Sequence, residues 1–292
     1  MQNKRIFTLV GFVCLAAFFG AKALYPKHVA MIDVQGKPSQ DLVALLSLTG
    51  VEHDGSLASI VQATQAAWIR KPGTERWDIV DTIIDNRDQF FTFFKKLHLI
   101  DQVDPSKKQY DYALWMGAAY PRIETRLTHL IALWQQGKRF HHLILLAGAR
   151  PLTESEKSAM VIAYNLKEDA VLETETDAMK MVYEKSVMPE SMRAVQLVVI
   201  DVPMQLTKDG ALTRPTTGDT VNSWLAMQPS PGNCLVISNQ PYVGYQDSVT
   251  KTLLPADFIV ETVGEKSVDT TIGIYLDTLA RYLYQEKKRL NL

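Results

Sequence analysis

The chain has 292 residues, a formal net charge of −1 and 47% apolar residues. This length suits one large domain or one domain with an appendage, and the apolar share allows a sizeable core. The near-neutral charge excludes a general nucleic-acid binder, which needs a basic surface, although it allows a local basic pocket. Two cysteines, Cys14 and Cys234, exclude a disulfide framework, a zinc motif and a CxxC redox pair.

The first 23 residues have the parts of a secretory signal. Lys4 and Arg5 precede the uncharged apolar run Ile6–Gly20, and the small-x-small site Ala21–Ala23 follows. The run is shorter than the roughly 20 residues that cross a membrane. We expect residues 1–23 to be a cleaved signal, or else an anchor that ties a periplasmic protein to the inner membrane. A buried N-terminal core helix is the remaining alternative.

Residues 24–109 are predicted to form a mainly helical cap or extra layer on the sheet. The expected elements are a short strand at His28–Asp33 and helices at Leu42–Leu48, Leu57–Ile69 and Trp77–Leu99. Pro72-Gly73 separates the last two helices. The aromatic cluster Phe90–Phe94 is expected in the core, and an apolar face for a membrane or a partner is the alternative.

A strand, a helix and a second strand are predicted next. Two short apolar runs, Tyr112–Met116 and Leu143–Ala147, are each followed by Gly-Ala, which is typical of buried parallel strands. Between them, apolar residues including Leu127 and Trp134 recur on one helical face, and Gly137 stands where a helix cap is expected. The three elements form a right-handed βαβ unit.

Strand and helix patterns alternate through the rest of the chain. Further helices are expected from Glu154 to about Leu166 and at Glu175–Val187, Asp219–Met227, Gly244–Leu254 and Asp269–Arg289. Further strands are expected at Ala170–Leu172, Leu197–Asp201, Cys234–Ser238 and Phe258–Glu261, with a loop over Leu206–Gly218. For residues 110–292 this alternation predicts an α/β domain, a doubly wound and mainly parallel sheet with helices on both faces.

Arginines and hydroxyls gather where the predicted strands end, and ligands of such sheets bind at that edge. Arg122 and Arg126 share one helix face, Arg150 leaves the neighbouring strand, and Arg214 lies in a Thr-rich loop. Guanidinium groups beside helix N-termini suit phosphate or carboxylate. The alternative is that each arginine pairs with a local glutamate. No nucleotide or hydrolase motif is present, the six histidines lack metal-ligand spacing, and the sequence identifies no cofactor.

These strand-end segments resemble the SanA/YdcF-like family, bacterial α/β proteins often associated with the cell envelope. The resemblance covers Tyr110–Thr262, about half of the chain. It is carried by Gly117-Ala118, Arg126-Leu127, Gly137-Lys138, Ala147-Gly148, Glu156, Met160, Thr217–Asn222, Leu235–Ser238 and Pro241-Tyr242. Where the family usually has Asn-Thr and then Glu-Asn, this chain has Asp219-Thr220 and then Asn222-Ser223. Where it has a late His and an Arg three residues on, this chain has Tyr242 and Tyr245.

The resemblance and the strand-end chemistry together predict an exported protein that binds a small anionic or lipid-linked, phosphate-bearing envelope precursor, with or without hydrolase or transferase activity. The expected catalytic residues are Glu156, Asp219 and Thr220. The expected ligand-binding residues are Gly117, Arg122, Arg126, Gly148, Arg150, Arg214, Thr217, Asn222, Ser238, Asn239 and Tyr242. We expect no metal site, no nucleic-acid partner, and membrane association only through the N-terminus.

The alternative is a non-catalytic binding or scaffold protein that keeps the fold without the active-site His and Arg. Tyr is a poor replacement for a His that titrates near neutral pH. A nicotinamide or flavin enzyme is a third reading, disfavoured because the first loop lacks the needed glycines. From the sequence alone, Arg150→Ala is expected to weaken phosphate binding and to change folding stability much less.

Overall fold

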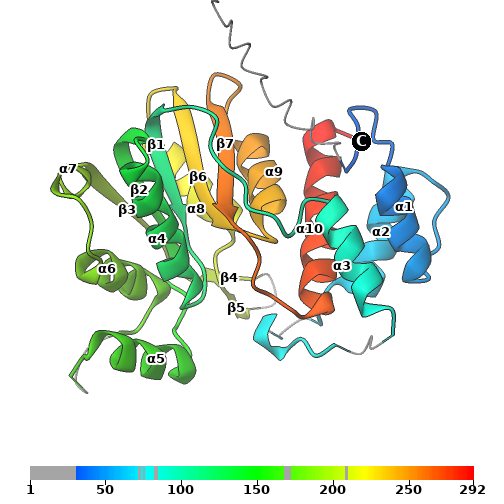
Figure 1. Ribbon diagram of the computed structural model, residues 1–292, viewed down its shortest axis with the longest axis horizontal. Helices are drawn as coiled ribbons and strands as arrows, with labels where there is room; N and C mark the ends of the chain where they lie inside the picture. Colours follow the sequence, from blue (N-terminus) through cyan, green and yellow to red (C-terminus); the bar gives the residue numbers. More distant parts are fainter. Residues whose placement is uncertain (1–30, 72–73, 75, 82–84, 168–171, 208–209) are drawn as a thin grey trace, which may run out of the picture.

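The computed structural model describes residues 31–292 except 72–73, 75, 82–84, 168–171 and 208–209. Its main sheet has five parallel strands in the order β3-β2-β1-β6-β7. They are β1 (Gln109–Met116), β2 (Arg139–Gly148), β3 (Gln196–Val202), β6 (Asn233–Asn239) and β7 (Ile259–Glu265). Helices flank the sheet (Figure 1), and the predicted doubly wound α/β fold is confirmed.

Each face of the sheet packs against its own pair of helices. One face carries α4 (Arg122–Gln135) and α6 (Glu175–Lys185), and the other carries α8 (Thr217–Leu225) and α9 (Val243–Leu253). Side chains alternate along each strand, so Trp115 of β1 joins the first core and Leu114 joins the second. Leu127 and Trp134 are buried in the first core, as their helical spacing predicted.

The strand order reverses beside β1, and this reversal places the site. From β1 the chain passes through α4 to β2 on one side, whereas β6, reached much later through α8, pairs with β1 on the other side. The loops that leave β1 and β6 therefore diverge at the carboxyl edge and open a crevice there, which is where open α/β sheets bind ligands. Two further helices, α5 (Glu154–Tyr164) and α7 (Glu190–Arg193), lie between β2 and β3 in the chain.

The N-terminal helices form an extra layer against the last helix rather than directly on the sheet (Figure 1). The layer contains α1 (Gln40–Leu48), α2 (Leu57–Trp68), the short 3-10 helix η1 (Arg76–Asp78), α3 (Arg87–Lys96) and α10 (Ile272–Leu290). Phe90 and Phe94 are buried in its core, where the ring of Phe94 stacks on Tyr275 at a centroid distance of 4.5 Å. The core interpretation of this aromatic cluster is therefore correct. Helix α10 also packs on α9, which joins the layer to the sheet.

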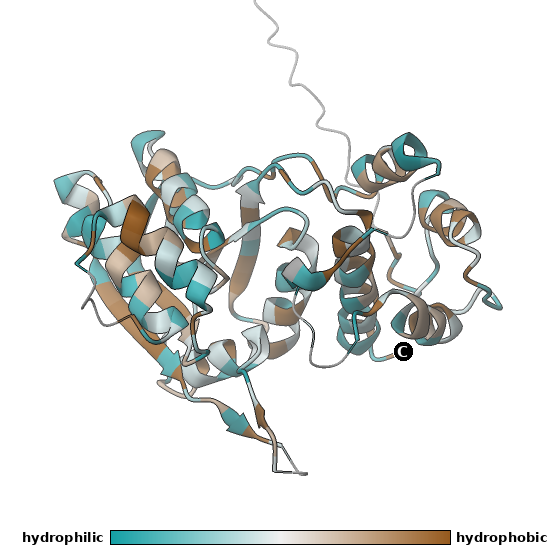
Figure 2. Ribbon diagram, turned by 90° about the horizontal axis from the view of Figure 1, so that it is seen from below, coloured by the Kyte–Doolittle hydropathy of each residue, from teal (hydrophilic) through white to brown (hydrophobic). Residues whose placement is uncertain are grey.

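Three sequence predictions differ from the structure. The single helix expected over Trp77–Leu99 is replaced by η1 and α3, because Asn86 takes a left-handed conformation (φ 59°) at the start of α3. The loop expected over Leu206–Gly218 contains a hairpin, β4 (Gln205–Leu206) and β5 (Leu212–Thr213), and the first turn of α8. Two-residue strands are too short for a periodic signal. Figure 2 shows this hairpin projecting from the body.

Other predictions fall wholly or partly outside the described residues. These include the signal or anchor at residues 1–23, most of the strand expected at 28–33, and residues 170–171 of the strand expected at Ala170–Leu172. Leu172 itself lies in no strand, and Ile32 makes only an isolated bridge with Pro38. Among the described residues, no helix is both long enough and apolar enough to cross a membrane.

Candidate functional site

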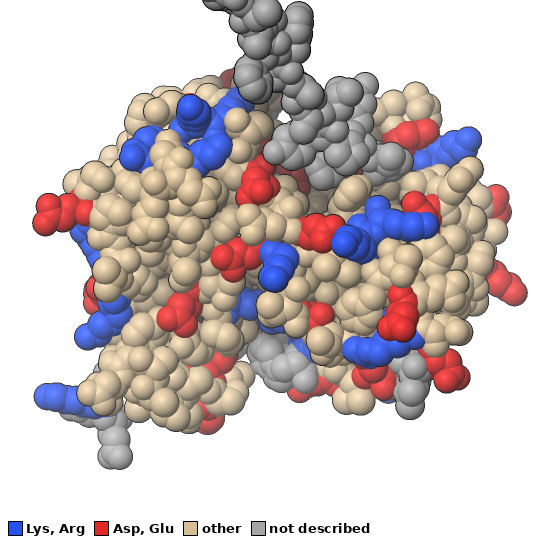
Figure 3. Space-filling view, viewed as in Figure 1, with Lys and Arg blue, Asp and Glu red and all other residues tan. Residues whose placement is uncertain are grey.

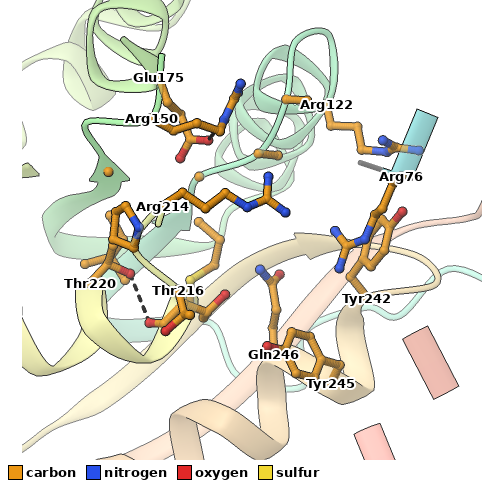
Figure 4. Close-up of a pocket in the computed structure, with 18 of the residues that line it drawn as sticks. Arg76, Arg122, Arg150, Glu175, Arg214, Thr216, Thr220, Tyr242, Tyr245 and Gln246 are labelled. Carbon is orange, nitrogen blue, oxygen red and sulfur yellow. Dashed lines mark hydrogen bonds and ion pairs between the residues drawn. The ribbon is translucent and has the colours of Figure 1, made fainter. Parts of the chain in front are cut away.

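A cavity of about 260 Å³ opens at the carboxyl ends of β1 and β2, beside the loop that follows β6 (Figure 4). Its described wall contains seven arginines and a single carboxylate, that of Glu175. The arginines are Arg70, Arg76, Arg122, Arg126, Arg150, Arg214 and Arg281. On the molecular face shown in Figure 3, by contrast, acidic and basic side chains are interspersed. Positive charge is therefore concentrated in the cavity.

Most of the residues predicted for the site line this cavity. They are Gly117, Arg122, Arg126, Gly148, Arg150, Arg214, Thr217, Thr220 and Tyr242. Five predicted residues do not line it: Glu156, Asp219, Asn222, Ser238 and Asn239. The structure therefore brings together the arginines and the strand-end glycines, whereas two of the three expected catalytic residues lie outside the wall.

Glu156 holds Arg150 in place. Its two carboxylate oxygens accept hydrogen bonds from Nη1 and Nη2 of Arg150, both at 2.9 Å, and the pair is buried. The same carboxylate accepts the backbone N–H groups of Tyr120 and Thr153. Burial opposes ionisation, but the hydrogen bonds from Arg150 and the backbone outweigh it and lower the pKa of Glu156. These contacts give Glu156 a positioning role in place of the catalytic role expected from the sequence.

Asp219 and Asn239 also have structural partners. Asp219 is the third residue of α8, and its carboxylate accepts hydrogen bonds from the backbone and the hydroxyl of Thr216, both at 2.7 Å, in a capping box. Asn239 is buried and accepts a hydrogen bond from Nε of Arg126 at 2.9 Å. Asn222 is exposed, and Ser238 is fully buried in β6. Of the three expected catalytic residues, Thr220 alone lines the cavity.

Arg126 is the buried cation of the site. Only 2% of its surface is exposed, and its hydrogen bonds go to Asn239 Oδ1 and to the carbonyl oxygens of Met116 and Gly117, all of them neutral acceptors. No described ion pair joins it to a carboxylate. Burial, followed by the charge of Arg122, lowers its pKa to about 9, which still leaves the guanidinium protonated at neutral pH.

The two predicted glycines allow close approach inside the cavity. A Cβ at Gly117 would overlap the carboxylate of Glu175, and a Cβ at Gly148 would overlap the ring of Pro215. Larger residues at these positions would push Glu175 and Pro215 away from the strand ends. The glycines therefore shape the wall without supplying functional groups of their own.

Sequence reasoning missed Glu175, the carboxylate of the wall. It is the first residue of α6, and it forms an ion pair with Nε of Arg150 at 3.2 Å. Burial raises the pKa of Glu175, although the charges of Arg150, Arg126 and Arg214 oppose this shift. The capping box formed by Thr174 and Asp177 marks the start of α6 in the sequence and could have pointed to this position.

Tyr242 and Tyr245, which stand where the resembling family has His and Arg, both line the cavity. Tyr242 is 1% exposed, and the guanidinium carbons of Arg76 and Arg122 lie 4.3 Å and 5.4 Å from its ring centroid. Its hydroxyl is buried and has no hydrogen-bond partner. In the described part of the chain, no group of three or more His, Cys, Asp or Glu side chains is arranged to hold a metal ion.

Acidification is expected to remove the stabilising effect of the pair formed by Arg150 and Glu156. The folded-state pKa of Glu156 lies below its ordinary value of 4.5. The contribution to stability is therefore complete above that value and is lost as the pH falls through the folded-state pKa. Thermal unfolding of the wild type and of Glu156→Gln at about pH 7 and about pH 3 tests this expectation. The variant should be less stable at the higher pH, and the difference should shrink at the lower one. A constant difference would contradict the expectation.

Comparison with protein-family models and with curated proteins finds no match to this chain. Its function is therefore argued from the geometry of the cavity.

Proposed function

We propose that the cavity binds a small anionic ligand through a phosphate group. The observation that carries the proposal is the convergence of seven guanidinium groups on one cavity whose described wall contains a single carboxylate. The carboxylates with described ion pairs to these arginines are Glu156, Glu175, Asp269 and Asp277, so positive charge remains in excess. Guanidinium groups donate parallel N–H bonds that match the oxygens of phosphate.

Arg126 gives the strongest support. A buried charge without a partner of opposite sign is expensive to maintain, because its hydration has been lost. The neutral oxygens around Arg126 satisfy part of its hydrogen-bonding capacity but none of its charge. A phosphate in the cavity would supply that charge. The helices α4, α6 and α8 begin at the same edge, and their N-termini add positive potential.

The size of the cavity limits what it can enclose. About 260 Å³ is slightly below the roughly 300–1,000 Å³ that encloses a drug-sized ligand. A head group fits, and the rest of a larger ligand would remain outside. This supports a phosphate-bearing envelope precursor, lipid-linked or free, as the ligand class. The apolar N-terminal run and the resemblance to the SanA/YdcF-like family support the same envelope location.

The proposal has a catalytic form and a non-catalytic form. In the catalytic form Glu175 is the acid–base group, because it is the carboxylate of the described wall and burial raises its pKa. In the non-catalytic form the cavity only binds, and Tyr242 and Tyr245 in place of a His and an Arg favour this form. Both forms require the same phosphate contacts, so binding is the property to test first.

Replacing Arg126 by glutamine is expected to weaken the binding of inorganic phosphate by about 1.5–3 kcal/mol, the scale of a hydrogen bond to a charged group. This corresponds to roughly 10-fold to 150-fold in Kd. Isothermal titration calorimetry measures the effect, and circular dichroism checks the fold.

Arg193→Gln is the matched control for this experiment. Arg193 belongs to α7, is exposed, and bonds only to the carbonyl oxygens of Tyr183 and Ser186, away from the cavity. It should bind phosphate like the wild type. Absence of phosphate binding in the wild type, or equal affinity in Arg126→Gln, would sink the proposal.

A further inference from the structure

A second concentration of positive charge lies on the side of the cavity formed by the helical layer. Asp277 of α10 is fully buried, and three arginines surround its carboxylate. Arg281 donates two hydrogen bonds of 3.0 Å, Nη1 of Arg70 lies at 3.2 Å, and Nε of Arg76 lies at 3.8 Å. Burial opposes ionisation, but the hydrogen bonds and charge of Arg281 outweigh it and lower the pKa of Asp277. One negative charge therefore meets three positive ones.

We call Arg70, Arg76 and Arg281 the layer group, because they come from the end of α2, from η1 and from α10. Arg126 and Arg150 form the strand-end group, which comes from α4 and from the residues after β2. Both groups line the same cavity. Figure 4 shows Arg150 and Arg76 on opposite sides, with the side chain of Arg214 extending between them.

Electrostatic contacts agree with this intermediate position of Arg214. Its charge lowers the pKa of Arg70 in the layer group, although burial is the main cause of that shift. The same charge opposes the raised pKa of Glu175, which contacts Arg150 in the strand-end group. A ligand that lies along Arg214 would therefore reach both groups.

Tyr242 marks the boundary between the two sides. Arg76 of the layer group and Arg122 at the start of α4 both lie over its ring. The phenol is 1% exposed, and its hydroxyl has no hydrogen-bond partner although the residue lines the cavity. Buried hydroxyls in proteins nearly always have a partner. A ligand oxygen placed between the two groups would provide one.

We infer that the cavity holds two linked phosphate groups at once, one on the strand-end group and one on the layer group, so that its ligand class is a diphosphate. This inference rests on the proposed function and narrows it. A single phosphate ester carries a charge of about −1.5 to −2, which can compensate one group of arginines but not both. A diphosphate spans the cavity, places its bridge beside Tyr242 and Arg214, and neutralises both sides.

The test compares inorganic phosphate with pyrophosphate, titrated calorimetrically into the full chain at one fixed ionic strength. The wild type should bind pyrophosphate at least about tenfold more tightly than phosphate. Arg76→Gln should lose this preference while its affinity for phosphate stays unchanged. Arg76 suits the test because its side chain is 26% exposed and its contact with Asp277 is the longest of the three, so the fold should tolerate the change.

Two further variants separate geometry from general charge. Arg193→Gln removes one positive charge far from the cavity and should keep the full preference. Arg76→Lys retains the charge but not the fork of donors, and should recover part of the preference. If the wild type binds neither ligand, the proposed function fails. If it binds both equally, or if Arg76→Gln keeps the preference, the two-phosphate inference is overturned while phosphate binding stands.

Discussion

Replacing Arg150 by alanine is expected to lower the free energy of unfolding by about 3–5 kcal/mol, the cost of breaking a buried ion pair from one side. The change leaves the carboxylate of Glu156 buried without its bidentate partner and removes the ion pair that Arg150 forms with Glu175. The sequence predicted the opposite balance, with an effect on binding and little effect on stability. That prediction is corrected by the contacts of Arg150, and Arg126, which has no carboxylate partner, becomes the sharper probe of ligand binding.

Urea unfolding at neutral pH measures this effect. The double variant Arg150→Met, Glu156→Gln is the informative control, because it removes both charges together and should recover part of the lost stability. A loss below about 1 kcal/mol for Arg150→Ala would show that the pair contributes no more than an exposed one. An equal loss in the double variant would assign the effect to packing instead of charge.

Replacing Trp134 by alanine is also expected to lower the free energy of unfolding by about 3–5 kcal/mol, through lost transfer energy and the cavity left behind. Trp134 is buried between α4 and the sheet. Its ring meets Phe140 edge-on at a centroid distance of 4.9 Å, and the guanidinium of Arg139 lies 4.6 Å from its ring centroid. Its Nε1–H donates to Ser191 at 3.2 Å.

Two variants frame the Trp134 experiment. Trp134→Phe keeps most of the buried ring and should cost clearly less than alanine. Ile162→Ala removes an apolar side chain that is 81% exposed on α5 and should leave stability almost unchanged. Urea unfolding of all three gives the comparison. A loss below about 1 kcal/mol for Trp134→Ala would mean that this side of α4 contributes little to the core.

The strand-end half of the site could be predicted because it follows from local patterns. Apolar runs closed by glycine locate the ends of β1 and β2, and the helical spacing after β1 locates α4. Once these ends are known, the parallel sheet brings Arg126 and Arg150 to one edge without further information. What the pattern could not show was the pairing of each arginine, because Arg150 meets a buried carboxylate and Arg126 meets none.

The sequence by itself therefore determined the order of the elements, the parallel sheet and the edge at which a ligand would bind, since these depend on periodicity within a few residues. Only the tertiary structure decided that the helical layer contributes to the same cavity. Arg70 and Asp277 are 207 positions apart, yet they lie 3.2 Å from one another because α10 packs on α2. No local pattern encodes that contact: it arises from the burial of two distant apolar faces against each other.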